Sequence, residues 1–158
     1  MGTTRCLTAE QLTVGMTHEV RRQFSHAQIA RYCELADDHN AIHHDVEAAR
    51  LRFPNSPDIV VPGALIQSAI TGVFGTEFPG DGSLGLTFEP ERMRKPVYPD
   101  EVVVLRFEVI KIRAAIVEFK VTIEDETGAL ISRAAVRVLA PDAAYRAWWE
   151  AHHAGSRD

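Results

Sequence analysis

The part of the sequence richest in chemically active side chains is the run Asp37-Asp38-His39-Asn40-Ala41-Ile42-His43-His44-Asp45. Carboxylates, imidazoles and an amide follow one another here with few apolar residues between them. Groups of these types can take up, release and hold protons when a fold directs them into a cleft, and titratable residues gathered where an element ends are typical of functional sites. The run therefore suggests acid–base chemistry or a metal site, unless it is only the polar end of a helix.

Three interpretations of this run stay open at the level of the residues. In the first, Asn40 is the C-cap of a helix, and the histidines lie favourably near the negative end of its dipole without doing chemistry. In the second, His39 and His43 bind one metal ion, which requires the helix to continue through Asn40. In the third, Asp38 and His43 form an acid–base pair, which requires a backbone turn that Asn40 permits. The carboxylates before Asn40 favour a helix end and so weigh against the metal.

The flanking sequence indicates which elements would hold these residues. Apolar residues at helical spacing predict a helix over 26–38 with Ser25 as its N-cap. Asp45 is placed to cap a shorter helix that stops by Pro54. Two prolines and an Asn-Ser pair predict turns over 53–58. Residues of about 25–54 should therefore form a helical overhang beside the rest of the domain.

The sequence changes character after this overhang. Residues 60–75 carry no charged side chain, which predicts a central helix over about 62–77 that is apolar nearly all round and therefore buried. Alternating and β-branched blocks then predict four strands, followed by a short C-terminal helix. The strands are expected over 83–89, 101–113, 114–124 and 129–139, and the helix over about 141–154. We therefore expect one α+β domain over 1–158, with a long antiparallel sheet of about 83–140 wrapped around the central helix.

Composition narrows the class of protein. The chain has 158 residues, of which 46% are hydrophobic, and 17 Lys+Arg against 22 Asp+Glu leave a formal charge of −5. This length suffices for one domain with its own core, and the acidic balance argues against nucleic acid as the main partner. No apolar stretch is long enough to span a membrane, and no signal-like segment begins the chain, so a cytoplasmic location is expected. Cys6 and Cys33 lack the spacing of zinc or redox motifs.

Three motifs follow one another along the chain: Asp38-x-Asn40-x-x-His43, a Val-Val-x-Gly step that ends at Gly63, and Pro-Val-x-x-Asp-Glu over 96–101. Together they resemble the MaoC-like dehydratase family, the (R)-specific enoyl-CoA hydratases. The resemblance implies a hot-dog fold and a homodimer formed by joining sheets edge to edge. It also implies syn addition of water to a trans-2-enoyl-CoA or acyl-carrier thioester, or the reverse dehydration. No metal or redox cofactor is expected.

The resemblance also implies a role for particular residues. Asp38 and His43 would be the acid–base residues, with Asn40 orienting them. Gly63 would give its backbone N–H to the thioester oxygen, and Thr71 falls where the family often has a small hydroxyl residue near the site. These types suit the reaction, because adding water needs a base for the water, an acid for C2 and a donor where negative charge develops. A helix's first amides have no partner inside the helix and lie at its positive end.

Two positions depart from the family pattern, and one basic segment has two possible roles. Ala41 stands where many relatives have proline, and Pro62 stands where a histidine is frequent, so a side chain is lost while the amide of Gly63 is kept. The basic run 92–95 could meet the phosphates of coenzyme A or of an acyl carrier, although a solvated strand end is the interpretation that we favour.

Two other functional classes compete with a hydratase. A hot-dog thioesterase would use a carboxylate and water to attack the carbonyl carbon, which leaves His43 harder to explain. A non-catalytic acyl-binding subunit of a heterodimer would keep the fold and lose one member of the pair. Both Asp38 and His43 are present, which favours the hydratase.

Overall fold

The computed structural model describes residues 3–153. Within them, five strands form one antiparallel sheet: β1 (Thr17–Arg22), β2 (Leu84–Pro90), β3 (Val103–Arg113), β4 (Ile116–Asp125) and β5 (Leu130–Leu139). The α-helices are α1 (His26–Ala36), α2 (Val46–Arg52), α3 (Gly63–Thr76) and α4 (Ala143–His153). Two single-turn 3-10 helices, η1 (Ala9–Gln11) and η2 (Ala41–His43), complete the set. No helix in this part of the chain is long and apolar enough to cross a membrane.

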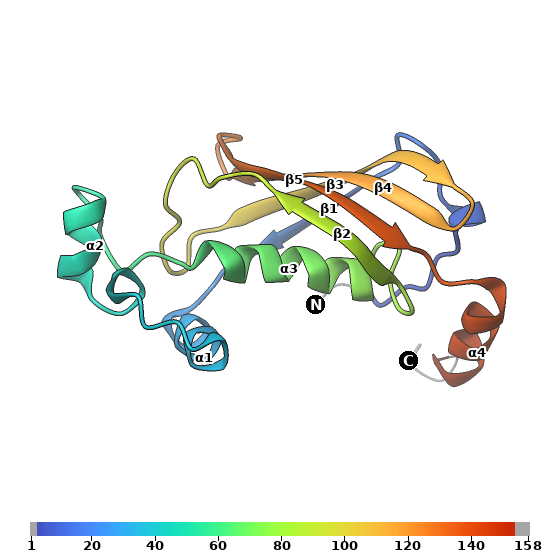
Figure 1. Ribbon diagram of the computed structural model, residues 1–158, viewed down its shortest axis with the longest axis horizontal. Coiled ribbons are helices and arrows are strands. Elements are labelled where there is room, and N and C mark those ends of the chain that lie inside the picture. The colour runs from blue at the N-terminus through green and yellow to red at the C-terminus, as the bar shows by residue number, and fades with distance from the viewer. Residues whose placement is uncertain (1–2, 154–158) are drawn as a thin grey trace.

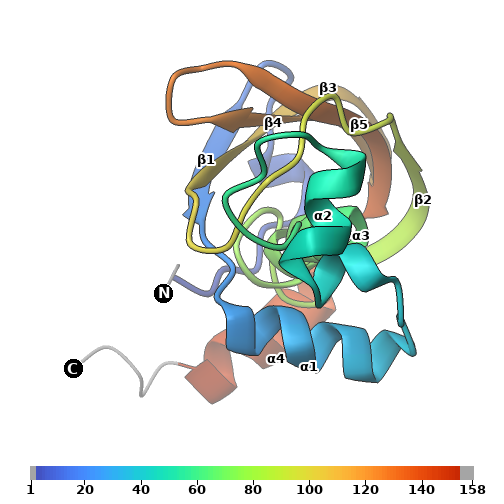
Figure 2. The ribbon, with the colours of Figure 1, turned by 90° about the vertical axis from the view of Figure 1, so that its left-hand side faces the viewer.

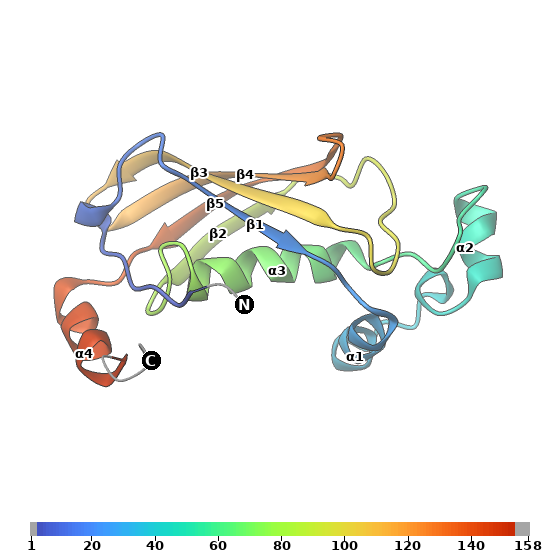
Figure 3. The same cartoon turned by 180° about the vertical axis from the view of Figure 1, so that it is seen from behind.

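The sheet curves around α3. Its strand order is β1-β3-β4-β5-β2, and every neighbouring pair is antiparallel. Figures 1 and 3 show α3 lying along one face of the sheet, with α1 and α2 beyond one end of it and α4 beyond the other. Figure 2, the view from the end that carries α1 and α2, shows the sheet arching over α3. A helix wrapped by a long antiparallel sheet confirms the expected α+β hot-dog domain.

Aromatic side chains pack the central helix against the sheet. Phe74 of α3 meets Phe107 of β3 and Phe119 of β4 in edge-to-face contacts, with ring centroids 5.2 Å and 4.8 Å apart. Such pairs add to the free energy gained from burying large apolar side chains. The inward face of α3 is buried through Ile66, Ile70, Val73 and Phe74.

The expectation that the central helix is buried all round is wrong for its outward face. Within the helix, the exposed residues on this face are small or hydroxylated: Ala64, Ser68, Thr71, Gly72, Gly75 and Thr76. None of them is charged, so the composition looked uniformly apolar. Small side chains cost little to leave in water, which is why the absence of charge did not require burial. The helix runs over 63–76, close to the expected 62–77.

The fifth strand, β1, was not among the four expected. Its sequence, THEVRR, holds one buried apolar residue, Val20, which pairs opposite Leu105 of β3. A buried carboxylate also ties β1 to the end of α3: Glu77 accepts from Arg22 at 2.7 Å and pairs with His18 at 3.0 Å. Both contacts are long-range, so the local hydropathy pattern gave little indication of a strand.

Element boundaries otherwise differ from the expected ones by a few residues. The C-terminal helix, α4, begins at Ala143, with Asp142 accepting a hydrogen bond from the Tyr145 amide at 2.7 Å. The expected end of this helix, residue 154, lies outside the described residues. A further bond joins the Tyr145 hydroxyl to Asp81 at 2.7 Å and fixes α4 against the turn before β2.

Candidate active site

The backbone turns sharply where α1 ends, and that turn places the polar run. Asp37 adopts the left-handed conformation with φ of 52°, and the Asp38 amide donates to the Cys33 carbonyl at 2.9 Å. This is a Schellman-type helix end, which does not need glycine when Asp or Asn occupies the left-handed position. The helix therefore stops two residues before the expected 38, so Asn40 is not its C-cap. Instead Asn40 is the N-cap of η2, where its Oδ1 accepts from the Ile42 amide at 3.4 Å.

The early helix end also separates the two histidines that a metal would need. His39 is exposed and pairs with Asp37 at 2.8 Å, whereas His43 is buried at the end of η2. Among residues 3–153, no group of three or more His, Cys, Asp or Glu side chains is arranged to hold a metal ion. The metal-binding interpretation required His39 and His43 to lie on one continuous helix. That requirement is not met, because α1 ends at Ala36 and His43 belongs to η2.

Asp38 and His43 converge across the turn. The Nε2 atom of His43 lies 3.8 Å from Oδ2 of Asp38, which is too long for a direct hydrogen bond. A water molecule placed beside the line between these atoms is within hydrogen-bonding distance of both. The other carboxylate oxygen of Asp38 accepts from the Asn40 amide at 3.0 Å, so the carboxylate is oriented by the turn that carries it.

The hydrogen bond of its second nitrogen fixes the tautomer of the neutral His43 ring. Nδ1 lies 2.6 Å from the carbonyl oxygen of Val60, and a carbonyl can only accept. Nδ1 must therefore carry a proton, which leaves Nε2 as the free acceptor of the neutral ring. The side chain of His43 is only 9% exposed while that of Asp38 is 32% exposed, so the imidazole lies deeper than the carboxylate.

Val60 holds the walls of the site together through its backbone. Its amide donates to the Ile42 carbonyl at 2.9 Å, while its carbonyl accepts from His43. The next amide, that of Val61, donates to the Val97 carbonyl at 2.8 Å. Backbone hydrogen bonds thereby join three segments that are distant in sequence, those around Ile42, Val60 and Val97. Sequence patterns contained no signal for this role, because every residue except proline supplies the same backbone groups.

A cavity of about 340 Å³ joins the imidazole to the start of α3. Its walls are mainly apolar, with one basic segment: Ile42, His43, Phe53, Val60, Val61, Gly63, Met93, Arg94, Lys95, Pro96 and Val97. Gly63 is the first residue of α3, and within residues 3–153 no backbone carbonyl accepts from its amide. That amide lies at the positive end of the helix dipole, where it can stabilise negative charge. Asp38 lies beside this cavity and is not part of its wall.

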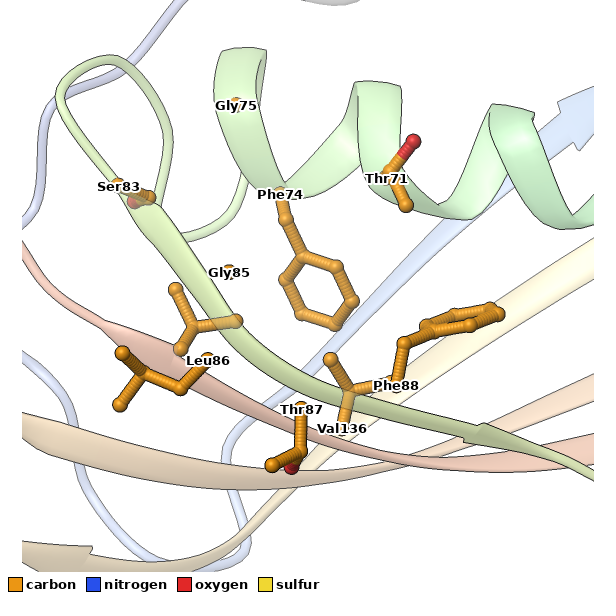
Figure 4. A pocket seen from close by; sticks show the side chains of 10 residues that line it. Thr71, Phe74, Gly75, Ser83, Gly85, Leu86, Thr87, Phe88 and Val136 are labelled. Atoms are coloured by element: carbon orange, nitrogen blue, oxygen red, sulfur yellow. The ribbon is translucent and has the colours of Figure 1, made fainter.

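Thr71 lies apart from the other predicted site residues. It is eight positions beyond Gly63, about 12 Å along the helix at 1.5 Å per residue. Its hydroxyl donates to the Ser68 carbonyl at 2.8 Å. Thr71 lines a second cavity, of about 270 Å³, between α3 and the strands β2 and β5 (Figure 4), and Phe74 and Phe88 also line it. The structure thus brings Asp38, held by the Asn40 amide, to His43, which shares a cavity with Gly63, and Thr71 lies in a different cavity.

Two neighbouring residues, His44 and Cys33, also contact Asp38. His44 is exposed, and its Nε2 donates to the Asp38 carbonyl at 3.0 Å, which supports the turn. Burial raises the pKa of the Cys33 thiol, and the nearby Asp38 carboxylate raises it further. Cys33 is buried in the hydrophobic core, and a buried thiol with a raised pKa is typical of a packing residue.

The basic run is partly engaged within the molecule. Arg94 pairs with Glu91 at 2.7 Å, and Lys95 pairs with Asp125. Hydrogen bonds, first of all the one from Lys95, hold the pKa of Asp125 well below its usual range. Arg92 is exposed and forms no ion pair with any described residue. These contacts favour the solvated strand end for most of the run.

The fold and the site together define a hot-dog protein with a carboxylate–imidazole pair at the start of its central helix. The chain belongs to the MaoC like domain family, whose model matches residues 9–129. It is 29% identical over 107 residues to the (R)-specific enoyl-CoA hydratase of Aeromonas caviae, covering 68% of this chain and 78% of that protein. It is 28% identical over 109 residues to a 3-hydroxybutyryl-CoA dehydratase of Methylorubrum extorquens, covering 68% and 67%. A solved (R)-hydratase from A. caviae superposes with a TM-score of 0.76 at 27% identity, covering 84% of this chain and 99% of that one.

Proposed function

We propose that this protein is a hydratase that adds water to trans-2-enoyl-CoA thioesters to give (R)-3-hydroxyacyl-CoA, or runs the reverse dehydration. One observation carries the proposal: Nε2 of His43 and Oδ2 of Asp38 lie 3.8 Å apart beside a cavity that also receives the unpartnered amide of Gly63. The A. caviae hydratase and the M. extorquens dehydratase support the same reaction class for this chain.

The water is held and activated by the acid–base pair. In the neutral ring, Nε2 of His43 accepts a proton from the water as its oxygen attacks C3 of the enoyl group. The imidazolium that forms is stabilised by the Asp38 carboxylate. Positioned acid–base groups of this kind contribute about 10²–10⁴-fold to the rate.

The electrons displaced from the double bond move toward the thioester carbonyl. Negative charge develops on the thioester oxygen, and the Gly63 amide donates to it. One such donor accounts for about 10²–10³-fold in rate. The enolate then takes a proton at C2 from the pair, so that OH and H end on C3 and C2. Because the water and the returning proton come from the same side, the addition is syn.

The substrate class follows from the walls of the cavity. Apolar side chains such as Phe53, Val61 and Val97 suit an acyl group, and a thioester is electrophilic enough at C3 for water to add. Arg92 is exposed and directly precedes Met93 of the cavity wall in the chain, so we propose that it meets a phosphate of coenzyme A or of an acyl carrier. Thr71 stays a predicted substrate-binding residue, and a cytoplasmic location and the lack of a metal or redox cofactor stay predictions.

We further propose that two copies pair through β2 to form a homodimer. Leu84 and Leu86 on this edge strand are 61% and 47% exposed. Exposed apolar side chains on an unpaired edge strand favour association with another chain. The opposite edge, β1, carries exposed Glu19 and Arg21, and charges protect an edge from pairing.

The assay that tests the reaction uses crotonyl-CoA and two readouts. A hydratase removes the absorbance of the enoyl thioester without releasing free thiol, whereas a thioesterase releases thiol. Chiral analysis of the 3-hydroxybutyryl product then gives the stereochemistry. Thiol release, a predominantly (S) product, or no change with a panel of enoyl-CoA and acyl-carrier thioesters would each refute the proposed reaction.

A further inference from the structure

The side chain of Met93 covers the first residue of the central helix. A Cβ atom placed on Gly63 would lie 3.2 Å from Cγ of Met93, 3.7 Å from its Cε and 3.9 Å from its Sδ. These are the three nearest side-chain or backbone atoms of any other segment to that position. The thioether therefore lies directly against the end of the helix whose amide we assign to the thioester oxygen.

The backbone on both sides of Met93 is fixed, while its side chain is adaptable. The Arg94 amide donates to the Ile131 carbonyl at 2.8 Å, and the Ser132 hydroxyl donates to the Arg92 carbonyl at 3.1 Å. Both bonds anchor the segment to β5. Met93 itself is half-buried, packs against the hydrophobic core and lines the cavity that contains His43 and Gly63. Methionine is unbranched and has three rotatable bonds, so it fills space without blocking it rigidly.

We propose that Met93 is a specificity-determining residue that limits substituents at C2 of the substrate, an inference that rests on the proposed hydratase function. A thioester oxygen bound to the Gly63 amide places the carbonyl carbon against Met93. C2 is one bond from that carbon, whereas each further carbon of the acyl chain leads away from it. A methyl group on C2 must enter space that the Met93 side chain occupies. Substitution at the acyl end should be far less sensitive to Met93.

The test compares three thioesters: crotonyl-CoA, its 2-methyl derivative and the longer trans-2-hexenoyl-CoA. The quantity measured is kcat/KM for each, in the wild type and in Met93→Ala. Removing most of the side chain should raise the ratio of 2-methylcrotonyl to crotonyl activity by about tenfold or more. This is the size of the effect that one methyl group has on kcat/KM in an apolar pocket. The ratio of hexenoyl to crotonyl activity should change by less than about threefold.

Two variants serve as matched controls. Met93→Leu conserves volume and should leave the 2-methyl ratio within about threefold of the wild-type value. Phe53→Ala removes another apolar side chain from the same cavity, but not one of those nearest Gly63, and should leave the 2-methyl ratio unchanged even if overall activity falls. If Met93→Ala does not fold, Met93→Phe takes its place, and the 2-methyl ratio should then fall instead of rising.

The outcomes separate this inference from the proposed function. A wild type that hydrates crotonyl-CoA, together with a 2-methyl ratio that does not respond to Met93→Ala or Met93→Phe, overturns the role of Met93 and leaves the hydratase assignment in place. An equal rise for hexenoyl-CoA also overturns it, because Met93 would then contact the acyl tail. A wild type inactive on every thioester refutes the hydratase assignment, and the Met93 inference with it.

Discussion

The Nδ1 atom of His43 donates a 2.6 Å hydrogen bond to the carbonyl of Val60, 17 residues further along the chain. This bond selects the tautomer in which Nε2 is free, and it points Nε2 toward Asp38. The Val60 amide is held in turn by the Ile42 carbonyl at 2.9 Å. Catalysis by the imidazole would therefore depend on a loop segment that supplies no functional side chain.

Two substitutions of His43 separate its chemical role from its structural role. Asn places an amide nitrogen near the position of Nδ1, so His43→Asn keeps a donor for the Val60 carbonyl and loses the base. Ala loses both. We expect kcat on crotonyl-CoA to fall about 10²–10⁴-fold in each variant. Only His43→Ala should lose about 1–3 kcal/mol in the free energy of unfolding, because it leaves a buried carbonyl unpaired. Urea denaturation measures the second effect; equal stability of the two variants would contradict it.

Adjacent carboxylates provide a matched test of Asp38. Asp38→Asn keeps an acceptor for the Asn40 amide but removes the charge that stabilises the imidazolium, so kcat should fall about 10²-fold or more. Asp37→Asn changes the neighbouring carboxylate, which is 91% exposed and pairs with His39, and should retain wild-type activity. Steady-state kinetics on both variants checks this. Comparable losses at the two positions would mean that net charge near the cavity, and not the Asp38 carboxylate, is what matters.

Two glycines of α3 test the proposed oxyanion donor. Gly63→Ala puts a methyl group 3.2 Å from Met93 and next to the amide that the thioester oxygen must reach, so kcat/KM should fall by about tenfold or more. Gly72 has no atom within 4 Å of an added Cβ. Gly72→Ala should therefore stabilise the helix by about 0.5–1 kcal/mol and leave kcat/KM unchanged. Unaltered kinetics in Gly63→Ala would remove the case for an oxyanion donor here.

The buried carboxylate of Glu77 makes stability depend on pH. Burial alone would raise its pKa, but hydrogen bonds from His18 and Arg22 outweigh burial and hold the pKa below its ordinary value of 4.5. A carboxyl group with a lowered pKa stabilises the folded state above its ordinary pKa, and this stabilisation is lost as the pH falls. Glu77→Gln should therefore cost about 1–3 kcal/mol at neutral pH, and the difference from wild type should narrow below about pH 4.5.

Thermal unfolding across a pH series measures this difference. Glu126 offers a control, because its pair with Arg21 is more than half exposed on both sides. Glu126→Gln should leave the melting temperature nearly unchanged at every pH. A gap between wild type and Glu77→Gln that stays constant down to pH 3 would show that the lost contact is insensitive to the charge of Glu77.

Charge placed on the β2 edge tests the proposed dimer. Leu86→Lys puts a cation on the strand that we expect to pair with its symmetry mate, so the variant should be monomeric where the wild type is dimeric. Leu35→Lys is the control, since Leu35 on α1 is 89% exposed and lies on another element. Light scattering after size exclusion gives both masses. A wild-type monomer, or a dimer that survives Leu86→Lys, rules out pairing through this edge.

Much of the fold followed from local sequence. Helical spacing predicted α1, the Asp45 cap and Pro54 predicted α2, an uncharged run predicted the central helix, and alternating or β-branched blocks predicted β2 to β5. All of these signals depend on residues close together in the chain. β1 did not follow from it, since Val20 is its only buried apolar residue, and the strand is held by pairing with β3 and by the contacts of His18 and Arg22 with Glu77. The exposed face of α3 was also missed, because small uncharged residues occur both in cores and on surfaces, so the sequence did not show which face of the helix is exposed.

The sequence by itself identified the residues that we propose carry chemistry: Asp38, Asn40 and His43 in one short turn, and a glycine at the start of a helix without charge. Tertiary structure alone decided where they face. It supplied the Val60 carbonyl that sets the His43 tautomer, placed Met93 over Gly63 and put Thr71 in a separate cavity. The physical reason is that each of these arrangements brings together segments that are distant in the chain, so no local residue type or spacing encodes it.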